Sequence, residues 1–113
     1  MSQVTTHILD TSIGKPASDV AVILQKAGKK NEWITIGMGL TDADGRIKDL
    51  LSTDRILEPG VYHLIFDTKT YYSRQGKPGF YPSVTIEFEL ADSSHYHVPL
   101  LLNPFGYSTY RGS

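Results

Sequence analysis

The sequence predicts an all-β fold, an antiparallel β-sandwich of two sheets built from seven or eight short strands, with one short helix. Segments rich in β-branched and aromatic residues recur at close intervals, with turn-forming residues between them. Residues 84–90 alternate apolar and polar side chains at every position, which is typical of a strand with one solvated face. Residues 68–75 lack this two-residue period, and this segment is the expected helix. Many short strands separated by turns indicate two packed sheets.

Four of the expected strands lie in the first half of the chain. Residues 4–9 precede a turn-rich stretch, and residues 19–26 carry apolar side chains on both faces, as a buried strand does. Residues 33–40 follow the turn sequence Gly-Lys-Lys-Asn, and residues 46–51 follow the turn sequence Thr-Asp-Ala-Asp-Gly. Each turn is therefore expected to end one strand and start the next.

The other four expected strands lie in the second half. Residues 61–67 follow Pro-Gly and are rich in β-branched and aromatic side chains, and residues 84–90 show the alternation described above. Residues 96–102 and 107–110 each follow a turn sequence, Asp-Ser-Ser and Asn-Pro-Phe-Gly. Pro99 conflicts with an interior place in its strand, because proline cannot donate a ladder hydrogen bond. An edge or a bulge is expected there.

Composition limits the number of domains and the class of partner. With 113 residues, 40% hydrophobic and 20% charged, the chain has the size and composition of one globular domain, placed over residues 1–113. A formal net charge of −1 provides no basic surface for nucleic acid or an anionic membrane. The absence of cysteine excludes disulfides and thiolate metal sites. No signal-peptide pattern and no bilayer-spanning apolar run is present, so a cytoplasmic protein is expected.

Several side chains could carry chemistry, although each alone has a plainer explanation. His95 and His97 lie two residues apart, so a strand would place both imidazoles on one face, where they could chelate zinc or copper. No cysteine and no second pair of this kind completes such a site. Arg46 directly follows a turn and could present its guanidinium to a carboxylate or a planar anionic ring, or could be a solvated surface side chain. His7, taken alone, is best explained as a half-exposed strand residue.

Three stretches taken together resemble one known family. Residues 6–10, Thr-His-Ile-Leu-Asp, are followed at 14–17 by Gly-Lys-Pro-Ala. Residues 66–69, Phe-Asp-Thr-Lys, precede a Tyr-Tyr pair, and residues 102–109 read Leu-Asn-Pro-Phe-Gly-Tyr-Ser-Thr. These stretches are similar to the N-terminal signature, the strand before the single helix and the C-terminal hairpin of the transthyretin superfamily. The resemblance covers essentially the whole chain, with Asn103 as a departure where serine is commoner.

Three positions and one tetrapeptide are similar to the enzyme branch of this superfamily, the 5-hydroxyisourate hydrolases. His7 stands where the hormone carrier transthyretin has lysine, and Arg46 stands where the carrier has an acidic residue. His97 stands where the carrier has threonine, and the tetrapeptide Tyr-Arg-Gly-Ser at 110–113 is typical of the hydrolases. The combination of these positions is far more specific than any one of them.

The resemblance implies a fold, an assembly and a reaction. The fold is a transthyretin-like Greek-key β-sandwich, and the assembly is a homotetramer with a central channel and active sites at the dimer–dimer interface. The reaction is hydrolysis of 5-hydroxyisourate to 2-oxo-4-hydroxy-4-carboxy-5-ureidoimidazoline, in urate degradation towards allantoin, without a cofactor. A carrier that binds small aromatic ligands without turnover is the alternative function. A metal-binding module that uses His95 and His97 is a third.

The resemblance also implies roles for individual residues. His7, Arg46 and His97 are the expected catalytic residues: the histidines would activate and orient water, and the guanidinium would stabilise charge on the scissile carbonyl. An imidazole with a pKa of about 6.5 suits a base near neutrality, and either histidine could be that base. No metal ligand is expected, and His95 is left outside the catalytic set. The expected substrate-binding residues are Tyr110, Arg111, Gly112 and Ser113.

Overall fold

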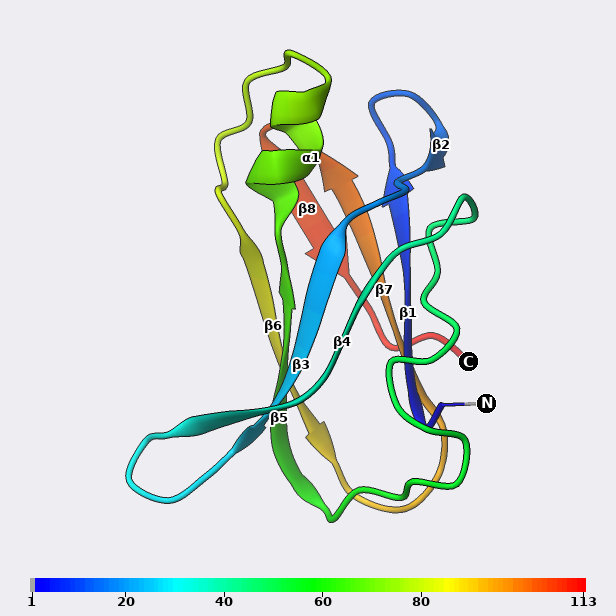
Figure 1. The fold of residues 1–113 in the computed structure, drawn as a ribbon, viewed down its shortest axis with the longest axis vertical. Helices are drawn as coiled ribbons and strands as arrows, with labels where there is room; N and C mark the ends of the chain where they lie inside the picture. The colour runs from blue at the N-terminus through cyan, green and yellow to red at the C-terminus, as the bar shows by residue number, and fades with distance from the viewer. Residues whose placement is uncertain (1) are drawn as a thin grey trace.

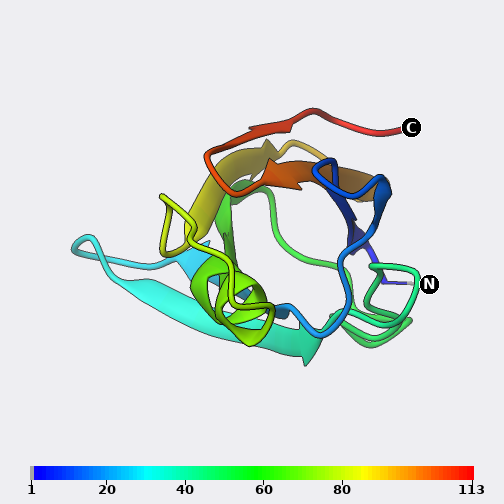
Figure 2. The same ribbon diagram turned by 90° about the horizontal axis from the view of Figure 1, so that it is seen from above.

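Two four-stranded sheets pack face to face in the computed structural model, which describes residues 2–113 (Figure 1). The first sheet has the strand order β2-β1-β7-β8 and the second has the order β4-β3-β5-β6. Seen from above, the sheets form two layers (Figure 2), and the helix α1 lies at one end of the sandwich (Figure 1). The predicted sandwich of short strands with one short helix is confirmed. The elements are β1 (Val4–Asp10), β2 (Lys15–Pro16), β3 (Ala21–Ala27), β4 (Trp33–Leu40), β5 (Gly60–Phe66), α1 (Thr68–Arg74), β6 (Val84–Leu90), β7 (Tyr96–Asn103) and β8 (Gly106–Thr109).

β1 and β7 form a parallel pair, whereas the other strand pairs of residues 2–113 are antiparallel. In this parallel register Thr5 lies opposite His97, and His7 lies opposite Pro99. Side chains alternate between the two faces of a strand, so these four residues share one face of the first sheet. The intervening residues, such as the fully buried Ile8, face the second sheet. The pairing therefore brings residues from both ends of the chain together on the outer face.

The core lies between the two sheets, and the alternation of side chains fixes which face turns inward. In β3 the fully buried Val22 and Leu24 alternate with half-buried residues, and in β5 Leu64 and Phe66 do the same. Burying one such side chain stabilises the fold by about 1.5–3 kcal/mol. A slip of one residue would expose all of them at once. The same constraint keeps the polar face of β1 and β7 directed outward.

Residues 46–51 do not form the strand that the sequence predicts. Arg46 makes an isolated antiparallel bridge with His7, and the rest of the segment is turn and irregular structure. Ile47, Leu50 and Leu51 are all buried in the core. A strand with a period of two cannot direct this set of side chains to one face, so the segment covers the core as a loop.

Pro99 lies within β7, an interior strand of its sheet, where an edge or a bulge was expected. β8 ends at Thr109, which pairs with Leu100, so Pro99 lies one residue beyond that ladder. The Pro99 carbonyl accepts a hydrogen bond from the Thr109 hydroxyl at 2.7 Å. The N–H and carbonyl of an extended residue point to the same side. Because His97 bridges Gly112 farther along, the chain still follows β7 past Pro99, and the missing N–H coincides with an interruption of the β7–β8 ladder rather than with a free edge.

The helix α1 begins and ends as its local sequence indicates. The carboxylate of Asp67 caps it by accepting a hydrogen bond from the Thr70 N–H at 3.1 Å. Gly76 follows with a φ of +66°, the left-handed conformation that ends many helices. Tyr71 anchors the helix to β1, because its hydroxyl donates to the buried carboxylate of Asp10 at 2.8 Å. Among residues 2–113, no helix has the length and apolar character needed to cross a membrane.

Removing the Tyr71 hydroxyl should destabilise this anchor. Burial and the hydrogen bond to Asp10 raise the pKa of Tyr71 to about 12, so the hydroxyl keeps its proton at neutral pH. Tyr71→Phe leaves a buried carboxylate oxygen without its donor, which costs about 1–3 kcal/mol of unfolding free energy. Denaturant titration measures the loss. Tyr107→Phe, at an exposed position of β8, is the matched control, and an equal midpoint for both variants would contradict the expectation.

Candidate active site

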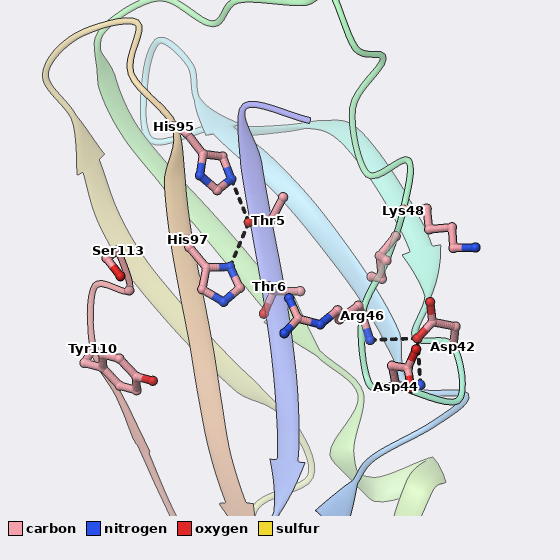
Figure 3. Close-up of a pocket in the computed structure, with 12 residues that line it drawn as sticks. Thr5, Thr6, Asp42, Asp44, Arg46, Lys48, His95, His97, Tyr110 and Ser113 are labelled. Atoms are coloured by element: carbon pink, nitrogen blue, oxygen red, sulfur yellow. Dashed lines mark hydrogen bonds between the residues drawn. The ribbon is translucent and has the colours of Figure 1, made fainter. Parts of the chain in front are cut away.

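A cleft of about 600 Å³ opens on the outer face of the first sheet (Figure 3). Its floor is formed where β1 and β7 begin, and the loop of residues 42–48 forms one wall. Residues of the segment 110–113 form the opposite wall. Parts of the chain that are far apart in sequence therefore meet at one place, and each contributes a different kind of polar group.

Two imidazoles on the cleft floor share one hydroxyl group. Oγ1 of Thr5 lies 2.7 Å from Nδ1 of His97 and 2.9 Å from Nε2 of His95 (Figure 3). The parallel register, which sets Thr5 opposite His97, produces this contact. The two rings are close to parallel, with their centroids 6.3 Å apart. Because Nδ1 of His97 is engaged, its Nε2 is the nitrogen left for a ligand.

The pKa of His97 is lowered from its ordinary value of 6.5. Burial is the largest cause, because it disfavours the charged imidazolium. The positive charge of Arg46 lowers this pKa further, and so do the imidazoles of His95 and His7. The lowered pKa favours the neutral form of His97, which is the form that can accept a proton.

Arg46 reaches the cleft from a tight turn. Oδ1 of Asp42 accepts hydrogen bonds from the N–H groups of Asp44 at 2.9 Å and Arg46 at 3.1 Å. The bond from the Arg46 backbone is the main reason why the pKa of the Asp42 carboxyl lies below its usual range. Gly45 supplies the left-handed residue of the turn, with a φ of +74°. From this turn the Arg46 side chain extends across β1 towards His97 (Figure 3).

His7 lies beside the cleft rather than in its wall. Arg46 forms a bridge with His7, and the Ile8 N–H donates to the Gly45 carbonyl at 2.9 Å, so the turn is clamped to β1. His7 is half-buried and shares the outer face with His97. The chain therefore places the three predicted catalytic residues on one sheet face, with two of them in the cleft itself.

The segment 110–113 closes the cleft along β7. The Gly112 N–H donates to the His97 carbonyl at 2.8 Å. A Cβ atom at Gly112 would lie 2.6 Å from Cδ2 of His97, so glycine is needed for the segment to lie this close to the imidazole. Tyr110 and Ser113 also line the cleft, and the side chain of Tyr110 is directed towards β7 (Figure 3). Tyr110 is 58% exposed, which leaves its ring free to contact a ligand.

Arg111 is the predicted substrate-binding residue that the structure does not bring to this cleft. Its guanidinium lies 4.1 Å from the centroid of the Tyr96 ring, in the geometry of a cation–π contact. There it lines a second cleft of about 280 Å³ together with residues of β6. Successive residues of an extended segment point to opposite sides. Arg111 consequently turns away while Tyr110 and Gly112 line the first cleft.

Sequence reasoning missed two residues that organise the site. Thr5 lies two residues before His7, so the period of a strand already puts both on one face, and this signal could have identified it. Asp42 belongs to a recognisable turn sequence, but the sequence does not show that the turn holds Arg46 in place.

Among the described residues 2–113, no group of three or more histidine, cysteine, aspartate or glutamate side chains is arranged to hold a metal ion.

The arrangement combines a proton acceptor with a fixed cation. A neutral imidazole can take a proton from water, and a guanidinium can stabilise negative charge that develops on a carbonyl oxygen. The Tyr110 phenol and the Ser113 hydroxyl add hydrogen-bonding groups at the wall. Such a set is suited to the addition of water to a carbonyl group.

Sequence comparison relates the chain to a family that contains hydrolases. The HIUase/Transthyretin family matches residues 4–112. The chain is 46% identical over 110 residues to a 5-hydroxyisourate hydrolase of Salmonella dublin, and this match covers 96% of the chain and 79% of that protein. It is 40% identical over 114 residues to a 5-hydroxyisourate hydrolase of Mus musculus, with 99% and 96% covered.

Solved structures give the same relationship. The 5-hydroxyisourate hydrolase of Klebsiella pneumoniae superimposes with a TM-score of 0.84 at 38% identity, over 97% of this chain and 98% of that one. Sea bream transthyretin in complex with thyroxine superimposes with a TM-score of 0.91 at 34% identity, over 98% and 95%. One fold is thus common to an enzyme and to a protein that binds thyroxine, so the fold alone does not indicate which function a member has. The side chains of the cleft are the features that can distinguish the two functions. The chain belongs to the HIUase/Transthyretin family.

Proposed function

We propose that this chain hydrolyses 5-hydroxyisourate to 2-oxo-4-hydroxy-4-carboxy-5-ureidoimidazoline, a step of urate degradation towards allantoin. The observation that carries this proposal is the His97 imidazole, of lowered pKa, in one cleft with the Arg46 guanidinium. Two relatives that are 46% and 40% identical in sequence to this chain, over nearly its whole length, are 5-hydroxyisourate hydrolases. The function therefore rests on the sequence identity and on the cleft together.

In the proposed reaction, water adds to a carbonyl carbon of the six-membered ring. His97 accepts one proton of the water while the water oxygen bonds to that carbon, and Arg46 donates hydrogen bonds to the carbonyl oxygen as it becomes negative. The carbon–nitrogen bond of the ring then breaks, and the imidazolium returns its proton to the departing nitrogen. The hydroxyl from water stays on the carbon as part of a new carboxyl group. A lowered pKa suits both steps, because the base starts neutral and its protonated form is acidic.

The remaining site residues have supporting roles in this proposal. His7 orients water or substrate from the same sheet face. Tyr110 stacks on the planar substrate, Gly112 allows the wall to approach His97, and Ser113 offers a hydroxyl. For Arg111, the packing over Tyr96 supports a structural role in place of the substrate contact that the sequence predicted.

We propose that no cofactor takes part, because proton transfer and charge stabilisation are what ring opening requires and the imidazole and guanidinium can supply both. The activity should therefore survive treatment with a chelator. Loss of activity that zinc restores would instead support the metal-binding reading of His95 and His97.

The enzyme proposal is tested with substrate generated in place. Urate and urate oxidase produce 5-hydroxyisourate, whose absorbance decays slowly without further help. Adding the protein should accelerate this decay in proportion to its concentration. The same amount of the His97→Ala variant is the matched control. Decay at the spontaneous rate in the presence of wild-type protein would overturn the proposal.

A carrier function is the second candidate, since sea bream transthyretin, solved in complex with thyroxine, shares this fold. Calorimetry with iodinated phenols separates the two. We expect no saturable binding at concentrations where the hydrolase reaction is fast. Tight binding without turnover would favour the carrier instead.

We also propose that the chain assembles as a homotetramer. Each sheet ends in two edge strands, β2 and β8 in the first and β4 and β6 in the second, and exposed edges favour pairing with another chain. Phe105 and Tyr110, at 67% and 58% exposure, provide apolar surface next to β8. Light scattering should give about four times the chain mass of 12.6 kDa, and a fully active monomer would contradict the assembly.

The single domain over residues 1–113 and the cytoplasmic location stay predictions. One cooperative unfolding transition would test the single domain, and cell fractionation would test the location.

The activity should rise with pH and level off as His97 loses its proton. Protonated imidazole cannot accept a proton from water, and the pKa of this group is lowered, so half-maximal kcat/KM is expected below pH 6.5. Initial rates, corrected for spontaneous decay, give the midpoint of the kcat/KM profile. An NMR titration of the His97 ring gives the midpoint of its protonation. His95→Ala removes a group that lowers this pKa, so its midpoint should move upward. A wild-type midpoint above 6.5 would contradict the assignment.

A further inference from the structure

Thr5 stands between the two imidazoles of the cleft floor, 2.7 Å from Nδ1 of His97 and 2.9 Å from Nε2 of His95 (Figure 3). A threonine hydroxyl carries one hydrogen, so it donates to one of these nitrogens and accepts from the other. The two contacts are therefore coupled. The direction of the hydrogen bonds fixes which ring nitrogen of each histidine carries the proton.

Two arrangements satisfy this geometry. If Thr5 donates to Nδ1 of His97, that ring carries its proton on Nε2 and presents no lone pair to the cleft. If Thr5 accepts from Nδ1–H of His97, the lone pair lies on Nε2, and the hydroxyl donates to Nε2 of His95. His95 is exposed, so its own Nδ1–H can bond to water.

Arg46 distinguishes the two arrangements. Its side chain extends towards His97 (Figure 3), and a guanidinium has hydrogen-bond donors only and a permanent positive charge. An unprotonated nitrogen is favoured beside such a group, and an N–H is not. The neutral ring of His97 therefore keeps its proton on Nδ1, and the Thr5 hydroxyl accepts a hydrogen bond from this Nδ1–H group.

We propose that Thr5 is a positioning residue: its hydroxyl accepts from Nδ1–H of His97, donates to Nε2 of His95, and so keeps the Nε2 lone pair of His97 in the cleft. This inference rests on the proposed hydrolase function and assigns the general base to Nε2 of His97 rather than to His7. When Nε2 takes a proton from water, the bond from Nδ1–H to Thr5 is retained, so the imidazolium forms without rotation of the ring. His95 becomes the acceptor at the end of this chain of hydrogen bonds.

The neighbouring threonine shows what a purely structural hydroxyl does in this strand. Thr6 is buried, and its hydroxyl donates to the Val98 carbonyl at 2.7 Å, which reinforces the pairing of β1 with β7. Thr5 is half-buried on the outer face, and both hydrogen bonds of its hydroxyl are made with imidazole nitrogens. Loss of the Thr5 hydroxyl should therefore change the histidines before it changes the fold.

The first test needs no substrate. Long-range ¹H–¹⁵N NMR on the full chain, at a pH where His97 is neutral, identifies which ring nitrogen is protonated. Wild type should show the proton on Nδ1. Thr5→Val keeps the shape of the side chain without the hydroxyl and should move the proton to Nε2 or give a mixture. Thr5→Ser should restore the wild-type pattern, and Thr85→Val, at an exposed position of β6, is the matched control that should not alter it.

The second test is turnover of 5-hydroxyisourate by the same variants. The kcat of Thr5→Val should fall by about tenfold or more with little change in KM, because the hydroxyl touches the base and not the substrate. Thr5→Ser should stay close to wild type. Thermal unfolding of each variant verifies that the loss does not come from the fold.

The outcomes separate this inference from the function on which it rests. An active wild-type enzyme whose His97 carries its proton on Nε2 overturns the role of Thr5 and leaves the hydrolase in place. Unchanged kcat and an unchanged tautomer in Thr5→Val overturn it equally. A wild-type protein with the expected tautomer that does not accelerate substrate decay overturns the proposed function, and the positioning role with it.

Discussion

Replacement of His97 by alanine is expected to lower kcat/KM by about 10²–10⁴-fold, the loss typical of a missing general base. The side chain carries the Nε2 atom that takes the proton from water in the proposed reaction, and neither His95 nor His7 occupies that place. The coupled urate oxidase assay measures the loss. Because the ring also packs against Gly112, circular dichroism and light scattering are needed to verify that fold and assembly persist.

His63→Ala is the matched control for this variant, because it removes an imidazole from the other sheet. His63 stacks on Trp33 with 3.3 Å between ring centroids, and it bonds to Glu87 at 2.9 Å, so it is as firmly held as His97. Wild-type turnover is expected for it. If His97→Ala kept the turnover of this control, the base would have to be another group.

Replacement of Arg46 by alanine is expected to lower kcat by about 10²–10³-fold, as when one donor to a developing oxyanion is removed. Arg46→Lys keeps the charge but loses the planar pair of donors, so an intermediate rate is expected. The pKa of His97 should rise in Arg46→Ala, because the guanidinium helps to lower it. An NMR titration of the ring reads this change independently of turnover.

Lys48→Ala is the matched control for Arg46, since it removes a positive charge from the wall of the same cleft. In the structure Lys48 extends away from the Arg46 guanidinium (Figure 3). A small effect on kcat is expected. Equal losses in the two variants would mean that the net charge of the cleft matters and that the position of the guanidinium does not.

The strands were predictable where burial follows a period of two. β6, with its strict alternation, has the bounds that the sequence predicts. β4 also has its predicted bounds, but its burial does not alternate, and the turn sequence before it is the signal that marks it. The segment 46–51 was wrongly predicted as a strand, because apolar content was counted without its spacing. Ile47, Leu50 and Leu51 enter the core from a loop that only the packing of both sheets defines.

The site was predictable in its residue types but only in part in its geometry. The family resemblance selects His7, Arg46 and His97, yet the contact of Thr5 with two imidazoles depends on the parallel register of β1 and β7. Two-residue periodicity does not show which strands are neighbours, so no local pattern could reveal this contact. Likewise, the direction of Arg111 follows from how the segment 110–113 lies along β7.

The parallel pairing of β1 with β7 has a consequence for how the protein is made. Thr5 and His97 are 92 positions apart, so β1 leaves the ribosome long before its partner exists. Contacts of such high sequence separation form late and slow the folding of a domain. Until β7 emerges, β1 lacks its neighbour and is exposed to other nascent chains. A growing polypeptide consequently has no partial catalyst, because the cleft requires β1, β7 and the segment 110–113 to be present together.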